Sequence, residues 1–427
     1  MQKTTIARLL PAALLALASG SASAAGFQLL EQNASGLGNA YAGSAAVGEN
    51  ASTIYFNPAG MTLLQDREFS AGLSMVRPSF KFKDKGSSTG ILTGKASDAG
   101  GWAALPNAYL SWALDKDLYV GVGIGAPFGL VTKYNRGWLG SAHSIEFDIK
   151  TININPSIAW RVNDTVSLGF GLNWQRMEAE YLRRAGTVNA PGMPLASTFA
   201  KLKADDDSWG WNVGALFTLT DATRLGISYR SKIKHKLDGD LTGKGPIAPF
   251  NAAISSDAKA TVELPDTWII SAVHKLDSRW ELLGDVSWTG WSSIDKVDIK
   301  RTSGPMAGAI AQTLDTDFRD TWRVALGANY QLNDAWKLKF GIAWDQTPVR
   351  NAEKRLTSLP DNDRIWLSFG GQWKPSRAST LDLGVAYLHV DDTKINNGDA
   401  ADPQKGLVRG EYDSSVWILG AQYSQAF

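Results

Sequence analysis

The sequence of 427 residues contains no cysteine and only four histidines, which lie far apart along the chain. The absence of cysteine excludes disulfides, thiol nucleophiles and thiolate metal sites. Because the histidines form no metal-spaced cluster, we expect neither a metal site nor a bound cofactor. Lysine and arginine (43) nearly balance aspartate and glutamate (42), so the chain lacks the basic excess of a nucleic-acid-binding protein.

A long apolar run is also missing, because no stretch of the mature chain has the roughly 18 apolar residues that a membrane-spanning helix needs. The apolar stretch at residues 9–18 is too short to span a bilayer. It follows Lys3 and Arg8 and precedes a small-residue motif at residues 22–24. This arrangement is typical of a secretory signal peptide. We therefore expect a signal peptide over residues 1–24 and a mature chain that starts near Ala25.

The mature chain instead shows strict alternation of apolar residues with small or polar ones. One alternating run extends from Val166 to Trp174, and others begin at Trp209, Trp336 and Leu381. A period of two places all apolar side chains on one face of a β-strand. Runs of about 9 to 11 residues match the length of a tilted transmembrane strand. Several of the 17 tryptophans lie at strand ends, where an aromatic girdle would meet the membrane surface.

The connections between these runs alternate between short and long. Tight polar turns are expected at residues 115–116, 163–164, 221–222, 277–278, 333–334 and 375–376, and long loops at about 84–102, 131–144, 182–208, 240–258, 299–316, 350–362 and 391–411. Together they join 14 strands and leave both termini on the short-turn side, as in outer-membrane barrels. The sequence therefore predicts an all-β fold, a 14-stranded antiparallel transmembrane barrel over residues 67–427, in the outer membrane of a Gram-negative bacterium.

The last strand has an aromatic, apolar face and ends on Phe427. A terminal aromatic strand that closes onto the first strand resembles the assembly signal of bacterial outer-membrane barrels. We therefore expect the barrel-assembly machinery to recognise this strand. We also expect outer-membrane lipid and lipopolysaccharide to surround the barrel, and the protein to be a monomer.

Residues 25–66 do not alternate and are rich in glycine, alanine, serine and asparagine. They are either a periplasmic tail or a plug inside the barrel. Small residues would fit a lumen that 14 strands leave too wide to fill with their own side chains. Composition alone favours neither interpretation.

The third strand breaks its pattern at Ala126, Pro127, Phe128 and Gly129. Pro127 has no N–H group for the strand ladder, and Gly129 permits a bulge. An unpaired backbone group is costly in hydrocarbon, so a break within a closed barrel needs a reason. Either Pro127 ends the strand at the outer rim, or the wall has a gap that the plug covers.

Strand parity places several polar and charged side chains inside the barrel. These inward positions include Gln175, Met177, Tyr181 and Arg183 in the fifth strand, with Arg319, Arg323, Asp345 and Arg364 further along. Such charges commonly pair across the lumen, whereas a lone arginine among apolar neighbours can hold a ligand carboxylate. No serine or aspartate forms a catalytic motif with a histidine, so we expect a transport channel rather than an enzyme. An outer-membrane lipid hydrolase is the alternative from another class.

Several motifs resemble the FadL family, transporters of long-chain fatty acids and hydrophobic compounds in Gram-negative outer membranes. The motifs lie at residues 25–29, 35–43, 57–59, 106–107, 128–130, 183–186, 264–268 and 359–364. The resemblance covers essentially the whole mature chain. It implies that residues 25–66 form a hatch whose Asn57-Pro58-Ala59 motif matters for gating. It also implies that Asn57 contacts residues 126–129 and that a kink there opens a lateral hole in the wall.

The resemblance also implies a transport route that needs no energy source. Ligand would enter between loops 182–208 and 240–258, reach an apolar pocket and leave sideways into the outer leaflet. Arg183 matches the family's basic residue near the bound carboxylate. Met177 and Tyr181 share its face and are expected to contact the ligand.

The apolar residues Met193, Leu195 and Phe199 either line one side of the ligand entrance or pack within their own loop. A second basic position of the family falls near Leu314, where this chain has no cation. Because of that difference, the branch of the family that takes up neutral hydrocarbons stays an alternative. The expected ligand is therefore a long-chain fatty acid, with monoaromatic or alkane hydrocarbons as the alternative in the same fold.

Overall fold

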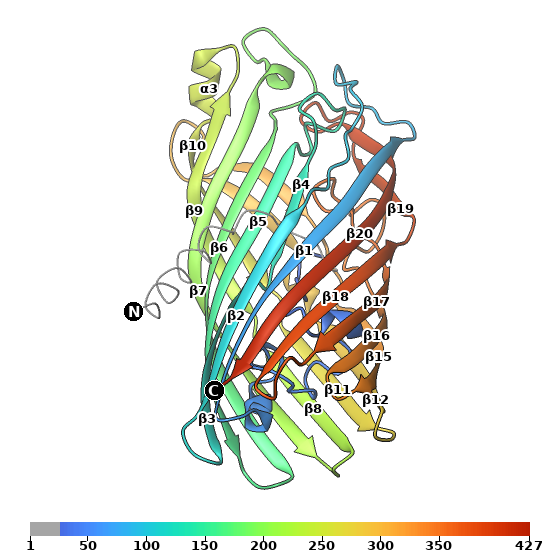
Figure 1. Ribbon diagram of the computed structural model, residues 1–427. Coiled ribbons are helices and arrows are strands. Elements are labelled where there is room, and N and C mark those ends of the chain that lie inside the picture. Colours follow the sequence, from blue (N-terminus) through green and yellow to red (C-terminus); the bar gives the residue numbers. More distant parts are fainter. Residues whose placement is uncertain (1–25) are drawn as a thin grey trace, which may run out of the picture.

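The computed structural model describes residues 26–427, and the expected signal peptide at residues 1–24 lies outside them. Antiparallel strands form a tall barrel around the first forty or so described residues (Figure 1). In this part of the chain no helix is long and apolar enough to cross a membrane.

The wall consists of 20 strand segments. Their bounds are β1 (Arg67–Asp84), β2 (Ala103–Ala113), β3 (Leu118–Gly125), β4 (Gly129–Lys133), β5 (Glu146–Arg161), β6 (Val166–Arg184), β7 (Phe199–Thr218), β8 (Thr223–Arg230), β9 (Ile233–Lys244), β10 (Ser256–Leu264), β11 (Thr267–Lys275), β12 (Trp280–Thr289), β13 (Lys296–Arg301), β14 (Ile310–Asp315), β15 (Thr321–Asn333), β16 (Trp336–Asp345), β17 (Arg364–Trp373), β18 (Ser379–Val390), β19 (Thr393–Gly398) and β20 (Leu407–Ala426). Six of the wall strands are interrupted once, as β3–β4, β8–β9, β10–β11, β12–β13, β14–β15 and β18–β19.

The wall closes because β1 pairs with β2 on one side and with β20 on the other. The β1–β20 ladder runs without a shift from the pair Glu68–Ala426 to the pair Asp84–Gly410. Counting each interrupted strand once, the barrel has 14 strands, and the predicted fold is confirmed. The six expected tight turns all join consecutive strands at the lower end in Figure 1, and the long loops lie at the upper end.

Four of the long loops are shorter than the sequence pattern suggests. Residues 299–316 include β14, residues 391–411 include β19 and the start of β20, and the other two form the expected ligand entrance. β6 and β7 pair as far as Arg184 and Phe199, so only residues 185–198, which include the 3-10 helix η3 (Leu195–Ser197), form a loop. Above the apolar band the outward side chains of these strands are charged. Glu180 on β6, for example, bonds Lys201 and Lys203 on β7, each at 2.6 Å. Because polar residues continue the ladder there, loss of apolar alternation is no sign of a loop.

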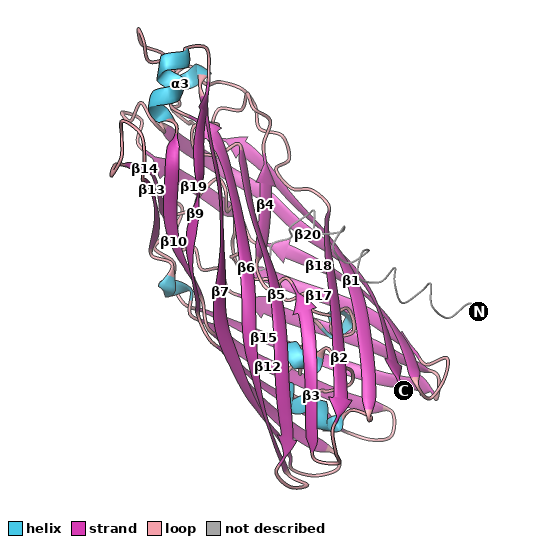
Figure 2. Ribbon diagram, turned by 90° about the vertical axis from the view of Figure 1, so that its left-hand side faces the viewer, coloured by secondary structure: helices cyan, strands magenta, loops and turns pink. Residues whose placement is uncertain are grey.

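The second expected loop, at residues 240–258, is also largely regular structure. It contains the end of β9, the helix α3 (Ala248–Ile254) and the start of β10 (Figure 2). The two sides of the expected ligand entrance are therefore extended walls of the barrel rather than loose loops.

Aromatic side chains mark both edges of the apolar outer surface. At the short-turn end the rings of Trp336 and Trp373 stack with centroids 6.0 Å apart. Toward the long-loop end Tyr229 packs between Trp211 and Trp268. Such rings combine an apolar body with a polar tip, which suits the boundary between lipid tails and water.

Residues 26–66, here called the N-terminal segment, lie inside the barrel toward its short-turn end (Figure 2). The segment contains three short helices, η1 (Leu37–Asn39), α2 (Thr53–Phe56) and η2 (Pro58–Leu63). Wall glycines let its backbone approach closely. A Cβ atom on Gly341 would lie 2.1 Å from the Asn39 backbone, and one on Gly226 would lie 2.0 Å from Ala45 O.

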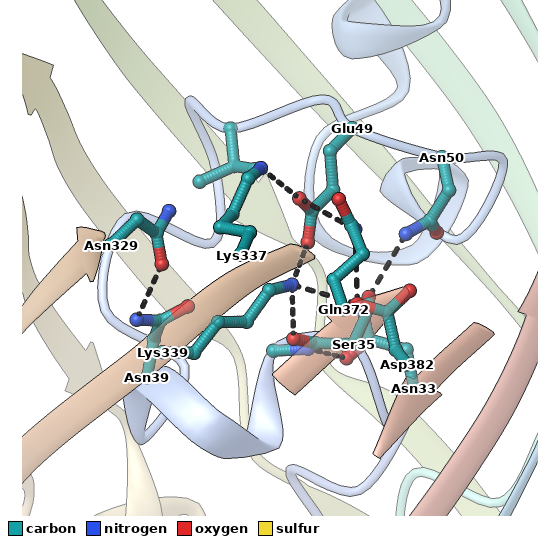
Figure 3. Close-up of polar contacts among 12 residues, drawn as sticks. Asn33, Ser35, Asn39, Glu49, Asn50, Asn329, Lys337, Lys339, Gln372 and Asp382 are labelled. Atoms are coloured by element: carbon teal, nitrogen blue, oxygen red, sulfur yellow. Dashed lines mark hydrogen bonds and ion pairs between the residues drawn. The ribbon is translucent and has the colours of Figure 1, made fainter. Parts of the chain in front are cut away.

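Buried ion pairs tie the N-terminal segment to the wall (Figure 3). Lys339 on β16 lies 2.5 Å from Glu49 of the segment and 3.0 Å from Asp382 on β18, and it donates to Ser35 O. Lys337 reaches the other oxygen of Glu49 at 3.5 Å. Burial alone would raise the pKa of Glu49, but the charges of Lys339 and Lys337 outweigh it and hold that pKa well below its usual range.

Candidate functional site

The third strand is broken where the sequence indicated. β3 pairs with both β2 and β5, whereas β4 pairs with β5 alone. The ladder between β2 and β3 ends at the pair Ala108–Ile124, so residues 103–107 of β2 face no strand partner on that side. Because the strand resumes as β4, Pro127 does not end it at the rim. The wall therefore lacks ladder hydrogen bonds between β2 and β4.

Residues of the N-terminal segment satisfy the backbone at this break. Leu29 N donates to Pro127 O and Gly129 N donates to Phe27 O, both at 2.8 Å. These two bonds make Gln28 and Phe128 an antiparallel bridge. The side-chain amide of Gln32 donates to Ala126 O at 2.7 Å. On the opposite side Phe128 N donates to the Thr151 hydroxyl at 2.9 Å.

Asn57 does not make the contact that the family resemblance implied. Its amide donates to Ala45 O at 2.7 Å and to Ala215 O on β7 at 3.0 Å, and its oxygen accepts from Ala59 N at the start of η2. Gly214 leaves the space for this side chain, since a Cβ atom there would lie 2.0 Å from Asn57 Oδ1. The Asn57-Pro58-Ala59 motif therefore binds the N-terminal segment to the β7 wall, and residues 27–32 contact the break instead.

An apolar pocket lies above the N-terminal segment, with a cavity volume of about 70 Å³. Its lining comes from Phe27, Leu130, Phe147, Ile149, Met177, Ala179, Tyr181, Leu202, Leu237, Ala260, Val262, Ile294, Val297, Ile299, Leu314, Thr316, Phe318, Leu356, Ser358 and Leu359. Met177 and Tyr181 point into it, as strand parity predicts. Leu314 also lines it, so the position where the family has a second basic residue contributes an apolar side chain here.

Aromatic rings close the pocket at its inner end. Phe27 lies 5.0 Å from Trp291 and 6.0 Å from Phe128, centroid to centroid, with the rings edge to face. Trp291 in turn contacts Phe318 at 5.9 Å and is fully buried. Phe27 therefore belongs both to the pocket and to the stretch of chain that covers the break in the wall.

The start of the described chain is bound beside this aromatic cluster. Gly26 N donates to Asp361 Oδ2 at 2.8 Å, and Arg364 forms a buried ion pair with the same carboxylate. The Thr347 hydroxyl also donates to Asp361, at 2.7 Å. Arg364 was expected among the lumen charges, but Asp361 was missed as a site residue. The sequence feature that could have identified Asp361 was its place in the motif at residues 359–364, three residues before Arg364.

Two cations lie beside β14, the strand whose Leu314 lines the pocket. Arg183 donates to Ala311 O at 3.2 Å and Lys405 donates to Thr313 O at 3.1 Å, so both reach the same stretch of β14. Burial and the charge of Arg183 lower the pKa of Lys405. Burial also lowers the pKa of His143 to about 4, with Lys405 and Arg183 contributing. Strand parity predicted Arg183 but not Lys405. Lys405 lies in a loop, where side chains do not alternate between two faces of a sheet.

The three apolar loop residues lie away from this pocket. Met193 is exposed at a tight turn with Ala190, and Leu195 is partly buried in η3 against Gly186. Phe199 packs under the guanidinium groups of Arg184 and Arg136. These contacts are packing within the loop and its base, which was one of the two interpretations open from sequence.

The remaining lumen charges are engaged by the protein itself. Arg319 donates to Thr347 O and lies 3.7 Å from Asp363. Arg323 donates to Ala40 O of the N-terminal segment at 2.6 Å and stands opposite Asp345 in the β15–β16 register. Pairing inside the lumen therefore accounts for these positions better than ligand binding.

A closed transmembrane barrel with an apolar pocket and an internal segment across a break in its wall defines a transport protein of the outer membrane. The chain belongs to the outer membrane protein transport family (OMPP1/FadL/TodX), whose model matches residues 15–427. It is 31% identical over 448 residues to the long-chain fatty acid transport protein of Salmonella typhi, covering 100% of both chains. It is 32% identical over 419 residues to outer membrane protein P1 of Haemophilus influenzae, covering 89% of each. The protein is therefore a transporter rather than an enzyme.

Solved structures agree with this fold. A Pseudomonas aeruginosa FadL homologue matches with a TM-score of 0.86 at 23% identity, covering 94% of this chain and 99% of its own. The toluene transporter TodX of P. putida matches with a TM-score of 0.69 at 17% identity, covering 92% and 98%. At these identities the likeness concerns the architecture of the barrel alone.

Proposed function

We propose that the protein is a passive channel for long-chain fatty acids. The observation that carries this proposal is an apolar pocket together with two partly buried cations, Arg183 and Lys405, that donate to the backbone of β14, the strand that contributes Leu314 to the pocket. The full-length relatives named long-chain fatty acid transport protein, for example that of Salmonella typhi, support the same ligand class.

The apolar pocket can bind the tail of an amphiphile, and the two cations can bind its charged head group. Each methylene group that leaves water for the pocket contributes about 0.8 kcal/mol. Among the ion pairs of residues 26–427, neither Arg183 nor Lys405 has a carboxylate partner; both donate to backbone carbonyls. A ligand carboxylate would give these cations a charged acceptor, and guanidinium geometry suits a carboxylate.

Uptake of monoaromatic or alkane hydrocarbons is the second candidate. The mostly apolar lining, with Leu314 at the expected second basic position, favours it. A neutral hydrocarbon would use the pocket without the cations, which makes the two candidates separable.

The test compares oleate with toluene in cells that carry Arg183→Ala or the double variant Arg183→Ala/Lys405→Ala. A charge-assisted hydrogen bond contributes about 1.5–3 kcal/mol, so oleate uptake should fall at least about tenfold. Toluene uptake should not change. Arg176→Ala is the matched control, because Arg176 lies on the same strand but faces outward toward Glu178, Asp205 and Asp207. Equal losses for both ligands would reject the carboxylate role.

We further propose that the ligand leaves sideways through the break between β2 and β4. The unpaired edge of β2 at residues 103–107 and the cover provided by residues 27–29 support this route. The N-terminal segment would act as the hatch and residues 1–24 as a cleaved signal peptide. A lateral exit keeps the acyl tail out of water, so no energy source is needed.

We also propose that the barrel works as a monomer within outer-membrane lipid and lipopolysaccharide. Its last strand would be recognised by the barrel-assembly machinery. Exposure of the Phe427 side chain beyond the end of β20 supports this last point. Deleting Phe427 should lower the amount of assembled barrel without changing transport per assembled molecule.

A further inference from the structure

A second cavity, here called the polar chamber, lies on the other side of the aromatic cluster from the apolar pocket. It is lined by Arg230, Arg323 and Asp345, by hydroxyl groups that include Ser228 and Ser287, and by Trp291. Its volume of about 40 Å³ has room for roughly three waters. Phe27 lines the pocket and Trp291 lines the chamber, so these two rings, 5.0 Å apart, separate the two spaces.

Arg230 gives the polar chamber a positive charge that the protein does not neutralise. The guanidinium donates to Tyr55 O at 2.9 Å and to the Asn173 side-chain oxygen, and it lies 4.2 Å above the Tyr55 ring. Both partner residues, Tyr55 and Asn173, are uncharged, and none of the ion pairs of residues 26–427 includes Arg230. Arg323 differs, because Asp345 stands opposite it in the register. The chamber therefore holds two guanidinium groups and one carboxylate.

A cation held away from bulk water is costly unless it is hydrated or paired. The chamber offers space, hydroxyl groups and the Arg230 guanidinium, which the Tyr55 ring covers on one face. These groups would bind a carboxylate better than they would bind an apolar chain. This lining contrasts with the apolar pocket, where all but two of the lining residues are hydrophobic.

One residue closes both the polar chamber and the break in the wall. The Gln28 amide donates to the Thr267 hydroxyl at 3.1 Å and accepts from the Thr289 hydroxyl at 3.3 Å, and all three residues line the chamber. The backbone of Gln28 also forms the bridge with Phe128 at the break. Moving residues 27–29 would therefore open the pocket, the chamber and the wall to one another in a single step.

From this juxtaposition we propose that the polar chamber is a second ligand site, which holds the carboxylate of an acid while its tail passes through the break. The inference rests on the proposed function. Arg183 and Lys405 receive the head group first, in the outer half of the barrel. Arg230 receives it after residues 27–29 have moved, so the charge stays paired while the tail enters the membrane ahead of it.

The first test replaces Arg230 and compares uptake of oleate with uptake of oleyl alcohol, which has the same tail without the charge. Arg230→Gln should lower oleate uptake at least fivefold and leave oleyl alcohol uptake unchanged. Arg224→Gln is the matched control. Arg224 faces inward on the same strand and donates to Val47 O of the N-terminal segment, but it does not line the chamber.

A second pair of variants covers the case in which Arg230→Gln fails to assemble. Ser287→Asp places a negative charge in the chamber, and Ser287→Asn has the same shape without the charge. Ser287→Asp should lower the oleate-to-alcohol uptake ratio as Arg230→Gln does, and Ser287→Asn should not. If the wild type takes up oleate and neither charge change alters the ratio, the chamber site is overturned while the proposed function stands. If the wild type takes up no oleate, both are overturned.

Discussion

The amide of Leu29 donates a hydrogen bond to the carbonyl oxygen of Pro127 at 2.8 Å, across a sequence separation of almost one hundred residues. With the bond from Gly129 N to Phe27 O, it makes residues 27–29 the partner that β4 lacks on the β2 side. Backbone groups at membrane depth need partners, so this contact keeps the break closed. The proposed lateral exit would require that these residues leave.

A disulfide between the two bridged residues should lock this contact. The chain has no cysteine, so Gln28→Cys/Phe128→Cys introduces a single thiol pair. Residues directly opposite in a pair that is not hydrogen-bonded have Cα atoms about 4.5 Å apart, within reach of a disulfide. Oxidation should abolish oleate uptake, and a reductant should restore it.

The two single cysteine variants, treated with the same oxidant, are the controls for the disulfide. Radiolabelled oleate uptake by intact cells is the measurement. Normal uptake by the fully oxidised double variant would show that ligand leaves without displacing residues 27–29 from the wall.

Asn57→Ala should loosen the N-terminal segment without preventing barrel assembly. The change leaves the buried carbonyls of Ala45 and Ala215 without their shared donor. We expect a loss of about 1–3 kcal/mol in the binding of the segment to the β7 wall. Hydrogen exchange of residues 45–64 should accelerate, and oleate uptake should fall. Unchanged exchange and uptake would mean that the motif has no part in holding the segment.

Glu49→Gln should remove an acid-sensitive anchor. The pKa of Glu49 is held below its usual range, so its contribution is complete above about pH 4.5 and is lost as the pH falls below that value. In the wild type, protection of the N-terminal segment against hydrogen exchange should therefore drop on acidification from pH 5 to pH 3. Glu49→Gln should show the weaker protection at both values. A wild-type drop that the variant reproduces in full would assign the effect to another group.

Glu31→Gln should act in the opposite pH range. Burial raises the pKa of Glu31 from 4.5 to about 7, against the attraction of Arg364 and Arg323. An acid whose pKa is raised in the folded protein favours the folded state less as the pH increases, here between about 4.5 and 7. That shift corresponds to about 3 kcal/mol. The thermal unfolding temperature of the wild type, relative to Glu31→Gln, should therefore be lower at pH 8 than at pH 5. A pH-independent difference would contradict this.

Periodicity in the sequence predicted the architecture because the membrane imposes one rule on every strand. Lipid contacts one face and the lumen the other, so parity placed Met177, Tyr181 and Arg323 inside, as the structure does. The same rule failed at residues 182–208, because beyond the membrane a charged outer face, such as Lys201 and Lys203 with Glu180, continues a strand equally well.

Contacts across the lumen could not be predicted from the periodicity of the sequence. Parity says which way a side chain points but not which of 14 strands or which part of the N-terminal segment it meets. Asn57 meets β7 rather than the break, and Lys405 meets β14 from a distant loop, because the path of the segment and the loops sets those partners.

The sequence by itself determined the barrel, its strand number and the point at which the third strand loses its pattern, since alternation, turn residues and a proline act locally. It left open whether the strand ends there or the wall has a gap. Only the tertiary structure decided that residues 27–29 cover the break and that Arg230 stands without a carboxylate beside the polar chamber. The physical reason is that the N-terminal segment has no regular period. Its small residues fit many surfaces, and its partners follow from the shape and hydrogen-bonding groups of the closed wall.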